Sequence, residues 1–511
     1  MWAILKTLYH NKLLSPKFII ILLFAIIRHG LNLFTLLVFT SKRFPNHVAV
    51  TMNQSEVTYK VLHHQVSCLM NVLNQQLSVN QKSKTAILAN NSLDCIKHII
   101  ACSGLGTHLY MLNPNLTAPQ IMTLIKQLHL ENLIYDPQYT QLAILSQENI
   151  NLIAMDNPLF HPKNQLLKKI KPSFSGKITL LTSGTTGMPK AVSRQPSLHQ
   201  FMGIFHVLFS QLRLHAYGSV LIATPLYHGF GFATLCMSLA LGKKMFVTEY
   251  FDAQKSIRII QKNRIEVITL VPIMLQRIIN HAPSQQLSSI KCIVCGGAVL
   301  PSTLVKHTQD TLGSVLFNLY GTSEAGVCTI ATPKTLEQHP NSIGKAIRGT
   351  KLTLYDTHHQ IITTDHTVGL LYASNPWSSE QIHKQINTKD LAYQNKEGYL
   401  FLAGRQDDMI ISGGENVYPI ELENILSQHA AIAEACVIGI KDDEFGQRLQ
   451  AFVVLKTNVQ LTKTQLFDWL SLHTARHQKP KYIVFMDALP YSSLGKIDKK
   501  QLVQRFNLSD A

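Results

Sequence analysis

Acidic residues are scarce in this 511-residue chain: 30 Asp and Glu stand against 47 Lys and Arg, a formal net charge of +17. The excess of positive charge favours anionic partners such as nucleotides, coenzyme A or anionic lipid. Nucleic acid would also suit the charge, but the sequence has no dense basic run interleaved with aromatic residues and no zinc-finger or RNP-like pattern. We therefore expect no nucleic-acid partner.

The eight cysteines lack the paired spacing of a disulfide framework or a zinc site. The one close pair, Cys292 and Cys295, lies in an apolar run without a second pair or histidine ligands. Two buried strand thiols explain this pair better than a metal site does. Such cysteine usage fits a reducing, cytoplasmic compartment.

The chain has no uninterrupted apolar run of membrane-spanning length, although one segment comes close. Residues 18–27 are apolar, Arg28-His29-Gly30 interrupts them, and residues 31–39 are again mostly apolar. An arginine at mid-span costs about 2.5–3.5 kcal/mol on insertion scales, so the segment is a poor transmembrane helix. It is also a poor signal peptide, because no small-residue cleavage pattern follows it.

Two interpretations of this segment stay open. Lys6, Lys12 and Lys17 precede an apolar run, so residues 13–39 are expected to lie on a membrane surface, with the basic side chains reaching the headgroups. A helix packed in the core of the main domain explains the same pattern. On the first interpretation the protein is cytoplasmic and associated with the inner face of a membrane.

From about residue 41, short apolar strands alternate with longer amphipathic stretches, for example residues 85–89 followed by residues 93–103. This alternation predicts an α/β fold in which parallel-type sheets are covered by helices. The length of the chain predicts more than one domain. Further strands are expected at residues 178–181, 220–223, 267–270, 292–295 and 316–319.

The pattern changes after Gly404 to a compact run of helix and strand signals, with a helix at residues 421–429 and a strand at residues 451–455. We expect a boundary near residues 405–408 with a hinge of one or two residues, because no long flexible linker is present. The predicted parts are an N-terminal hydrophobic, membrane-associating extension over residues 1–40, a large α/β domain over residues 41–404 and a small mobile α+β domain over residues 405–511.

The clearest chemical motif is Thr182-Ser-Gly-Thr-Thr-Gly-Met-Pro-Lys190, which follows a predicted strand. Its glycines let backbone amides turn toward a phosphate, its hydroxyls donate further hydrogen bonds and its lysine adds charge. It is not a Walker A loop, because Met-Pro separates the lysine from the second glycine. A polar turn is the alternative explanation. The residues expected to bind phosphate are Thr182, Ser183, Gly184, Thr185, Thr186, Gly187 and Lys190.

This loop and seven further segments resemble the adenylate-forming superfamily, which includes acyl-CoA synthetases, carrier-protein adenylation domains and firefly luciferase. The resemblance extends from about Phe44 to the C-terminus. It implies that residues 41–404 are an adenylation domain, in an enzyme that uses ATP, Mg²⁺ and coenzyme A to join AMP to a carboxylic acid and pass the acyl group to a thiol. The segments, in the family's order, are residues 225–229, 296–298, 320–324, 390, 404–408, 412–419 and 490–496.

The resemblance also implies roles for individual residues. Lys496 would neutralise the substrate carboxylate and the α-phosphate as these two anions meet, Glu324 would hold Mg²⁺ and Tyr320 would stack on adenine. The chain departs from the family at Ser323, where Thr is more common, and at Lys389, which replaces the glycine of a Thr-Gly-Asp motif. The other nucleotide-binding residues implied are Gly297, Ala298, Gly321, Thr322, Ser323, Asp390 and Arg405.

The resemblance also implies which residues bind the acid and coenzyme A. His228 would line the carboxylate end of the acyl pocket, where it positions or gates, because an acid already ionised near pH 7 needs no general base. The small domain would rotate about Asp407 between two half-reactions. Gly413 and Gly414 would then line a channel for the pantetheine arm of coenzyme A.

Apolar residues at 230–237 and 271–275 suit a hydrophobic acid. A medium- or long-chain fatty acid is expected, and an aryl acid is the open alternative. Free coenzyme A is the expected acceptor, because residues 413–419 resemble free-standing CoA ligases and no carrier-protein domain follows Lys496. One alternative is a fatty acyl-AMP ligase that loads a separate carrier protein. Another is a catalytically silent membrane acyl-lipid binding protein, although such a binder would need neither the phosphate loop nor Lys496.

Overall fold

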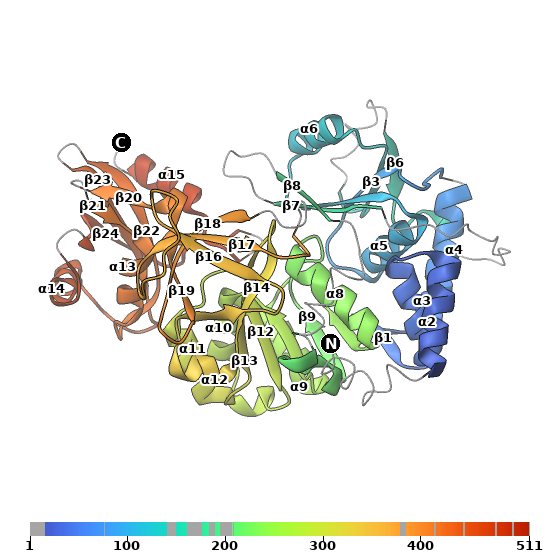
Figure 1. Cartoon of the computed structure of the whole chain (residues 1–511), viewed down its shortest axis with the longest axis horizontal. Helices are drawn as coiled ribbons and strands as arrows, with labels where there is room; N and C mark the ends of the chain where they lie inside the picture. The colour runs from blue at the N-terminus through green and yellow to red at the C-terminus, as the bar shows by residue number, and fades with distance from the viewer. Residues whose placement is uncertain are drawn as a thin grey trace. The chain divides into compact units, whose positions relative to one another are not determined.

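The computed structural model has the α/β architecture that the sequence predicts (Figure 1). Two compact units are present, a first unit of residues 1–270, 280–294 and 377–379 and a second unit of residues 271–279, 295–376 and 380–511. The division of the chain into parts at residues 40 and 404 is inferred from changes in the sequence pattern, and it stays a prediction. The residues described are 16–75, 77–139, 150–160, 176–182, 190–194, 207, 209–378, 385–412, 415–442, 445–475, 478–492 and 495–509.

A six-stranded sheet of the first unit has the strand order β6-β5-β3-β4-β7-β8. Neighbouring strands run parallel except for β7 and β8, which are antiparallel. Connections between parallel strands must cross over the sheet, which explains the alternation of strand and helix signals in the sequence. The strands are β3 (Lys84–Leu88), β4 (His108–Leu112), β5 (Asn132–Tyr135), β6 (Asn151–Ala154), β7 (Ile178–Thr182) and β8 (Lys190–Arg194).

A second group of strands in this unit has the order β11-β9-β10-β1-β2 and is parallel except at β1 and β2. The strand β12 (Cys292–Gly296) carries Cys292 and Cys295, both buried, as expected for strand thiols. The strands of the group are β1 (Val48–Met52), β2 (Ser55–Thr58), β9 (Ser219–Ile222), β10 (Lys244–Val247) and β11 (Val267–Leu270). The helices are α4 (Tyr59–Gln75), α5 (Leu93–Leu105), α6 (Ala118–Leu128), α8 (Gly229–Leu241) and α9 (Ala253–Asn263).

The ends of α5 show how the local sequence determines where a helix begins and ends. The Ser92 side chain accepts a hydrogen bond from the Cys95 N–H at 2.9 Å, which satisfies one of the free amides of the first turn. Gly106 ends the helix with φ 75°, a left-handed conformation that glycine adopts at little cost. Between these caps, Ile96, Ile99 and Ile100 are fully buried, and the helix covers β3 and β4.

The N-terminal segment forms a helical hairpin of α2 (Pro16–His29) and α3 (Leu33–Arg43), which lie side by side in Figure 1. Gly30 has φ 78° and Asn32 caps α3 by accepting the Thr35 N–H at 2.9 Å. The two helices have different environments. On α3, Phe34, Leu37 and other apolar side chains are buried, so the core-helix interpretation holds for this half of the segment. Within the described residues, no helix is long and apolar enough to cross a membrane.

The second unit contains an antiparallel set of strands in the order β16-β17-β18-β19-β15-β14-β13. The strands are β13 (Leu316–Thr322), β14 (Gly326–Ala331), β15 (Ser342–Ala346), β16 (Lys351–Tyr355), β17 (Gly369–Ser374), β18 (Ile386–Gln394) and β19 (Leu400–Arg405). The helices of this part are α10 (Pro272–His281), α11 (Ser302–Leu312) and α12 (Pro333–Gln338). Three strands separate β18 from β13 in this order, yet a hydrogen bond of 2.6 Å joins Tyr320 on β13 to Asp390 on β18.

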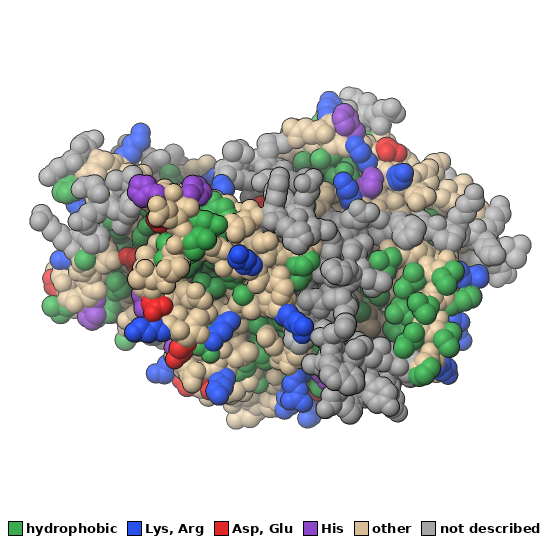
Figure 2. Space-filling view, viewed as in Figure 1, with side chains coloured by type: hydrophobic (Ala, Val, Ile, Leu, Met, Phe, Trp, Pro, Cys, Tyr) green, Lys and Arg blue, Asp and Glu red, His purple; other side chains and the backbone are tan. Residues whose placement is uncertain are grey.

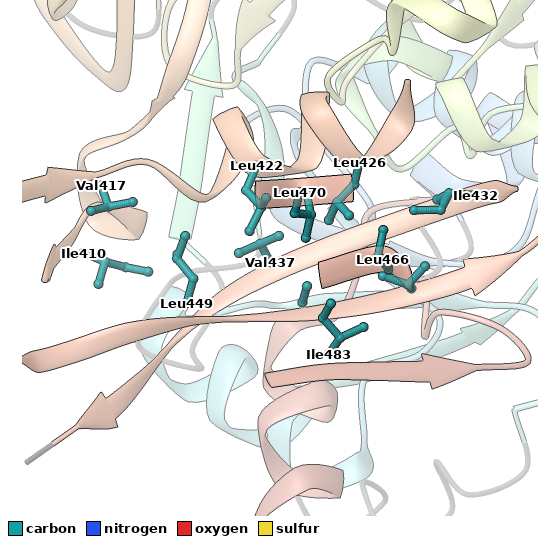
Figure 3. Close-up of a cluster of buried hydrophobic side chains, with 12 residues drawn as sticks. Ile410, Val417, Leu422, Leu426, Ile432, Val437, Leu449, Leu466, Leu470 and Ile483 are labelled. Atoms are coloured by element: carbon teal, nitrogen blue, oxygen red, sulfur yellow. The ribbon is translucent and has the colours of Figure 1, made fainter. Parts of the chain in front are cut away.

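The last part of the second unit is a sheet of order β21-β20-β23-β22, with β24 parallel to β23, packed against helices. Its core is a cluster of twelve buried apolar side chains that includes Leu422, Val437, Leu449 and Leu470 (Figure 3). The elements are β20 (Ile410–Ser412), β21 (Glu415–Val417), α13 (Pro419–Ser427), β22 (Ile432–Asp442), β23 (Gly446–Leu455), α14 (Lys463–His473), β24 (Tyr482–Met486) and α15 (Lys499–Ser509).

Candidate active site

Three of the predicted nucleotide-binding side chains meet within the second unit. Asp390 on β18 lies opposite Arg405 at the end of β19, because these strands are antiparallel and in register at this pair. The Tyr320 hydroxyl on β13 donates to Asp390 Oδ2 at 2.6 Å, and Arg405 Nη1 donates to Asp390 Oδ1 at 3.2 Å. Both oxygens of one carboxylate are therefore held by side chains from different strands.

The electrostatics of Asp390 follow from its burial, since only 8% of the residue is exposed. Burial raises the pKa of Asp390, while the hydrogen bond from Tyr320 and the charges of Arg405 and Lys496 act in the opposite direction. Burial and the nearby Asp390 carboxylate also hold the pKa of Tyr320 well above its usual value, so the hydroxyl keeps its proton and acts as a donor. The Asp390 carboxylate is therefore a buried hydrogen-bond acceptor whose orientation is fixed by Tyr320 and Arg405.

Lys389 shows how the chain accommodates the missing glycine before Asp390. Its φ is 62°, a left-handed conformation that costs a residue with a side chain roughly 1–2 kcal/mol. The Asn387 side chain accepts the Lys389 N–H at 2.7 Å, and Lys389 Nζ lies 3.7 Å from Asp407 Oδ2. The turn therefore keeps the backbone conformation that glycine favours and adds an ion pair to the predicted hinge residue.

Lys496 is brought to the same cluster by a tight turn. Gly495 has φ 68°, and a Cβ atom there would lie 2.5 Å from Val271 Cγ2, so the glycine is required both by conformation and by contact. Lys496 itself stays exposed to solvent. Partial desolvation and the charge of Arg405 lower the pKa of Lys496, whereas Asp390 and Glu324 raise it. These influences show that Lys496 shares one electrostatic environment with the residues of β13, β18 and β19.

Glu324 lies in the turn between β13 and β14, together with the exposed Ser323. The Ala325 N–H donates to the Thr322 hydroxyl at 3.0 Å, which closes the turn. A Cβ on Gly321 would collide with the carbonyl of Gly326, so the two strands approach each other more closely than other residues allow. Glu324 is half-buried in this turn, within the electrostatic range of Lys496.

The small residues after β12 form another part of the second unit. Gly296 lies against the backbone of Leu319 on β13, where a Cβ would be 2.5 Å from the carbonyl oxygen. Gly297 has φ 83° and is exposed, and Ala298 is half-buried. This stretch offers a flat, largely backbone surface beside the strand that carries Tyr320, which is the shape expected for one wall of a purine site.

The predicted phosphate loop is described only at its two ends. Thr182 and Lys190 lie opposite each other on the antiparallel strands β7 and β8 of the first unit. Residues 183–189, and with them Ser183, Gly184, Thr185, Thr186 and Gly187, lie outside the described residues. The next described element after β7 is the strand β8, whereas the loop of a Walker A site leads into a helix. Gly413 and Gly414 also lie outside the described residues, between β20 and β21.

His228, in the first unit, is the N-cap residue of α8, and its ring centroid lies 5.1 Å from that of Tyr227. A buried asparagine that no sequence motif points to stabilises the preceding loop. Asn91 accepts the Leu226 N–H at 2.7 Å and donates to the carbonyls of Thr224 and Thr248, each at 3.1 Å. The loop before His228 is therefore held in place by Asn91, a residue far away in the sequence.

Asn375 is a second residue that the sequence did not point to. It is buried, and its side-chain amide donates to the Ala325 carbonyl at 2.8 Å, next to Glu324. A single asparagine carries no motif, and only the burial of its amide reveals that it supports the turn. Among the described residues, no three His, Cys, Asp or Glu side chains gather at one point.

Comparison with known proteins gives two family matches. The profile described as AMP-binding enzyme matches residues 39–381, and the profile described as AMP-binding enzyme C-terminal domain matches residues 421–496. Among relatives, a 2-succinylbenzoate–CoA ligase from Bacillus pumilus is 28% identical over 487 residues, covering 91% of this chain and 97% of its own. An indoleacetate–CoA ligase from Aromatoleum aromaticum is 28% identical over 496 residues, covering 90% and 96%.

Solved structures share the fold. An o-succinylbenzoate CoA synthetase from Bacillus subtilis, in complex with its acyl-adenylate intermediate, has a TM-score of 0.80 at 24% identity and covers 91% of this chain and 97% of its own. An amide bond synthetase from Marinactinospora thermotolerans has a TM-score of 0.81 at 21% identity and covers 93% and 99%. At these identities the likeness establishes the architecture alone.

Proposed function

Because the chain belongs to the AMP-binding enzyme family and is an acid–thiol ligase, we propose that it activates an apolar carboxylic acid as acyl-AMP and transfers the acyl group to coenzyme A. The enzyme uses ATP, Mg²⁺ and coenzyme A. The observation that carries the proposal is the meeting of Tyr320, Asp390 and Arg405 within the second unit, with Lys496 in the electrostatic range of Asp390 and Arg405. These residues supply the aromatic, carboxylate and cationic groups that an adenine nucleotide needs.

In the first half-reaction a carboxylate oxygen attacks the α-phosphorus of ATP, and the bond to pyrophosphate breaks. Two anions must approach each other, so a cation placed between them lowers the barrier. We assign this role to Lys496, which is exposed and lies in the electrostatic range of Asp390 and Glu324. The left-handed backbone of Gly495 packs closely against Val271, which fixes the backbone position of Lys496.

Asp390 is assigned to the ribose, because hydroxyl groups donate and a buried carboxylate accepts. Tyr320 and Arg405 hold the two oxygens of Asp390 in place, and the Tyr320 ring remains the proposed stacking surface for adenine. Glu324 fits a magnesium ion as one oxygen ligand, and the triphosphate oxygens are the natural remaining ligands. Bound Mg²⁺ would supply charge neutralisation at the phosphates. The loop between Thr182 and Lys190 is proposed to bind the departing pyrophosphate.

In the second half-reaction the thiolate of coenzyme A attacks the acyl carbonyl carbon, and AMP leaves with the former carboxylate oxygen. Rotation about Asp407 between the two half-reactions, with Gly413 and Gly414 at the pantetheine channel, stays part of the proposal. Asp407 Oδ2 accepts from Arg405 Nη2 at 3.3 Å, and Asp408 forms an ion pair with Lys499 at 2.7 Å. A rotation about Asp407 would have to change its ion pairs with Arg405 and Lys389, whereas Asp408 and Lys499 both follow the hinge and would move together.

The substrate acid is proposed to be apolar, in keeping with the sequence of residues 230–237 and 271–275. We place aryl acids ahead of the predicted medium- and long-chain fatty acids, because the two relatives described above carry aryl acids in their names. His228 is proposed to position the carboxylate end of this acid. Attachment of the predicted segment, residues 13–39, to the inner face of a membrane is a separate proposal that does not depend on this chemistry, and it is limited to the part before α3, because α3 is buried.

The test is a panel of benzoates, arylalkanoates and fatty acids of increasing length, each assayed with ATP, Mg²⁺ and coenzyme A for pyrophosphate and thioester. Lys496→Ala should lower pyrophosphate release by roughly 100-fold or more while the fold and coenzyme A binding stay intact. Lys500→Ala, four residues away, is the matched control and should behave as the wild type. Pyrophosphate release at the wild-type rate in Lys496→Ala would refute the role assigned to Lys496.

The second candidate, an acyl-AMP ligase that loads a carrier protein, is separated by the same assay. A CoA ligase releases AMP when coenzyme A is added, whereas a carrier-loading enzyme accumulates acyl-AMP until a carrier protein is supplied. A silent lipid-binding protein would release no pyrophosphate with any acid of the panel. The three functions therefore give three different product patterns.

A further inference from the structure

The outer face of α2 is an apolar surface without a protein partner among the described residues. Ile20, Leu23, Phe24 and Ile27 are 66%, 53%, 62% and 76% exposed. Their spacing of three and four residues places them on one side of a helix. Figure 2 shows the apolar side chains gathered over α2. Single exposed apolar residues are ordinary, but a continuous face of large ones marks an interaction surface.

The opposite face of α2 is attached to the protein. Ala25 is 2% exposed, and α2 packs along α3, whose Leu37 is completely buried. The hairpin turn is fixed by Thr35, whose hydroxyl donates to the Gly30 carbonyl at 2.5 Å. The helix therefore lies along the surface of the first unit, with one face in the protein and the other in solvent. This is the arrangement of a helix that rests in a membrane interface.

The charges around this face define the partner. The first acidic residue of the chain is Glu56, so residues 1–55 contain six Lys or Arg and no Asp or Glu. Lys17 and Arg28 are exposed at the two ends of α2, and Lys42 is exposed at the end of α3. A second copy of this face would bring Lys17 and Arg28 against like charges, and residues 1–55 offer no carboxylate to pair with them. An anionic lipid surface neutralises the cations and accepts the apolar side chains at once.

We propose that the outer face of α2, formed by Ile20, Leu23, Phe24 and Ile27, lies in the headgroup region of an anionic phospholipid bilayer. Lys17 and Arg28 then contact lipid phosphates at either end of the apolar strip. The inference narrows the predicted membrane-associated segment to α2, because α3 is a core helix. It holds whichever acid the enzyme activates, since none of these residues belongs to the candidate active site.

The experiment is flotation of the full chain with vesicles of phosphatidylglycerol and phosphatidylcholine in equal parts, and with phosphatidylcholine vesicles. The wild type should float with the anionic vesicles, more weakly in high salt and more weakly with the neutral ones. Ile20→Gln/Phe24→Gln/Ile27→Gln should lower the partition coefficient by roughly tenfold or more. The matched control Ile361→Gln/Leu472→Gln changes exposed apolar residues elsewhere and should float as the wild type.

Charge is tested separately with Lys17→Gln/Arg28→Gln, which should weaken binding to the anionic vesicles by roughly fivefold for each charge removed and leave binding to neutral vesicles unchanged. Ligase activity on a water-soluble acid should be unaffected in every variant, which shows that the variants are folded and separates this inference from the proposed function. Failure of the wild type to float, or equal flotation of the triple variant, would overturn the proposal. So would a wild-type dimer that the triple variant converts to a monomer.

Discussion

The hydrogen bond from Tyr320 to Asp390 offers the most informative single change, Tyr320→Phe. Both residues are 8% exposed, and the 2.6 Å bond ends on a carboxylate. A hydrogen bond to a charged group contributes about 1.5–3 kcal/mol, and its loss leaves a buried oxygen of Asp390 without its side-chain donor. The ring itself is kept, so any stacking on adenine survives. The variant thus isolates the orientation and charge of Asp390.

The expected loss follows from that bond. We take about 2 kcal/mol as the part of the hydrogen-bond energy that orients Asp390 toward the ribose. Because 1.4 kcal/mol corresponds to a tenfold change, the dissociation constant for ATP should rise roughly 30-fold in Tyr320→Phe. The change should be equal for AMP, because the two nucleotides share the ribose. It should be seen by calorimetric titration of each nucleotide.

The pH dependence gives a second, independent prediction. Burial raises the pKa of Asp390, and nucleotide affinity should fall as the pH drops through that pKa, because the protonated acid is a weaker acceptor. The Tyr320 hydrogen bond lowers the pKa of Asp390, as do the charges of Arg405 and Lys496, whereas Asp407 raises it. Removing the hydroxyl should therefore raise the pKa further and move the acid limb of the affinity profile to higher pH.

The matched control is Tyr393→Phe, the same change on a half-buried tyrosine of β18, whose ring stacks on Phe401 at 5.0 Å. It should bind ATP as the wild type does, at every pH. The reasoning is refuted if Tyr320→Phe keeps wild-type affinity for AMP, or if its acid limb stays in place or moves to lower pH. Either outcome would mean that the hydroxyl does not support Asp390 in nucleotide binding.

Three further changes test other parts of the account. Gly495→Ala should slow pyrophosphate release at least tenfold, because the added Cβ would collide with Val271 and displace Lys496. Thioester formation from added acyl-AMP should change little. An equal loss in both assays would contradict this explanation. Asn91→Ala should lower the free energy of unfolding by about 3 kcal/mol, measured in urea, because three buried backbone groups lose their partner. Leu470→Ala should cost about 2–5 kcal/mol, seen as earlier melting of the C-terminal part, and unchanged melting would show that its cluster is not tightly packed.

Much of the fold could be predicted from local pattern. The expected strand at residues 85–89 and helix at residues 93–103 correspond to β3 and α5, within a residue or two at each end. The helix expected at residues 421–429 is α13, and the strand at residues 451–455 is the second half of β23. These elements have clear periodicity and recognisable caps, so their own residues determine them.

The bonds between site residues could not be predicted in the same way. The resemblance pointed to Tyr320, Asp390 and Arg405, but their mutual bonds depend on a strand order in which β15 separates β14 from β19. Nothing in the local sequence encodes that order. The N-terminal helices give the same lesson, because α2 is the more apolar of the two and yet its outer face is exposed, whereas tertiary packing buries α3.

The most direct measurement of the central claim follows an oxygen atom. The acid is labelled with ¹⁸O in its carboxylate and incubated with the enzyme, ATP, Mg²⁺ and coenzyme A, and the nucleotide product is analysed by mass spectrometry. If the carboxylate attacks the α-phosphorus and AMP later leaves from the acyl carbon, one labelled oxygen must appear in AMP. Label in inorganic phosphate together with ADP, or AMP without label, would contradict an acyl-adenylate pathway for this protein.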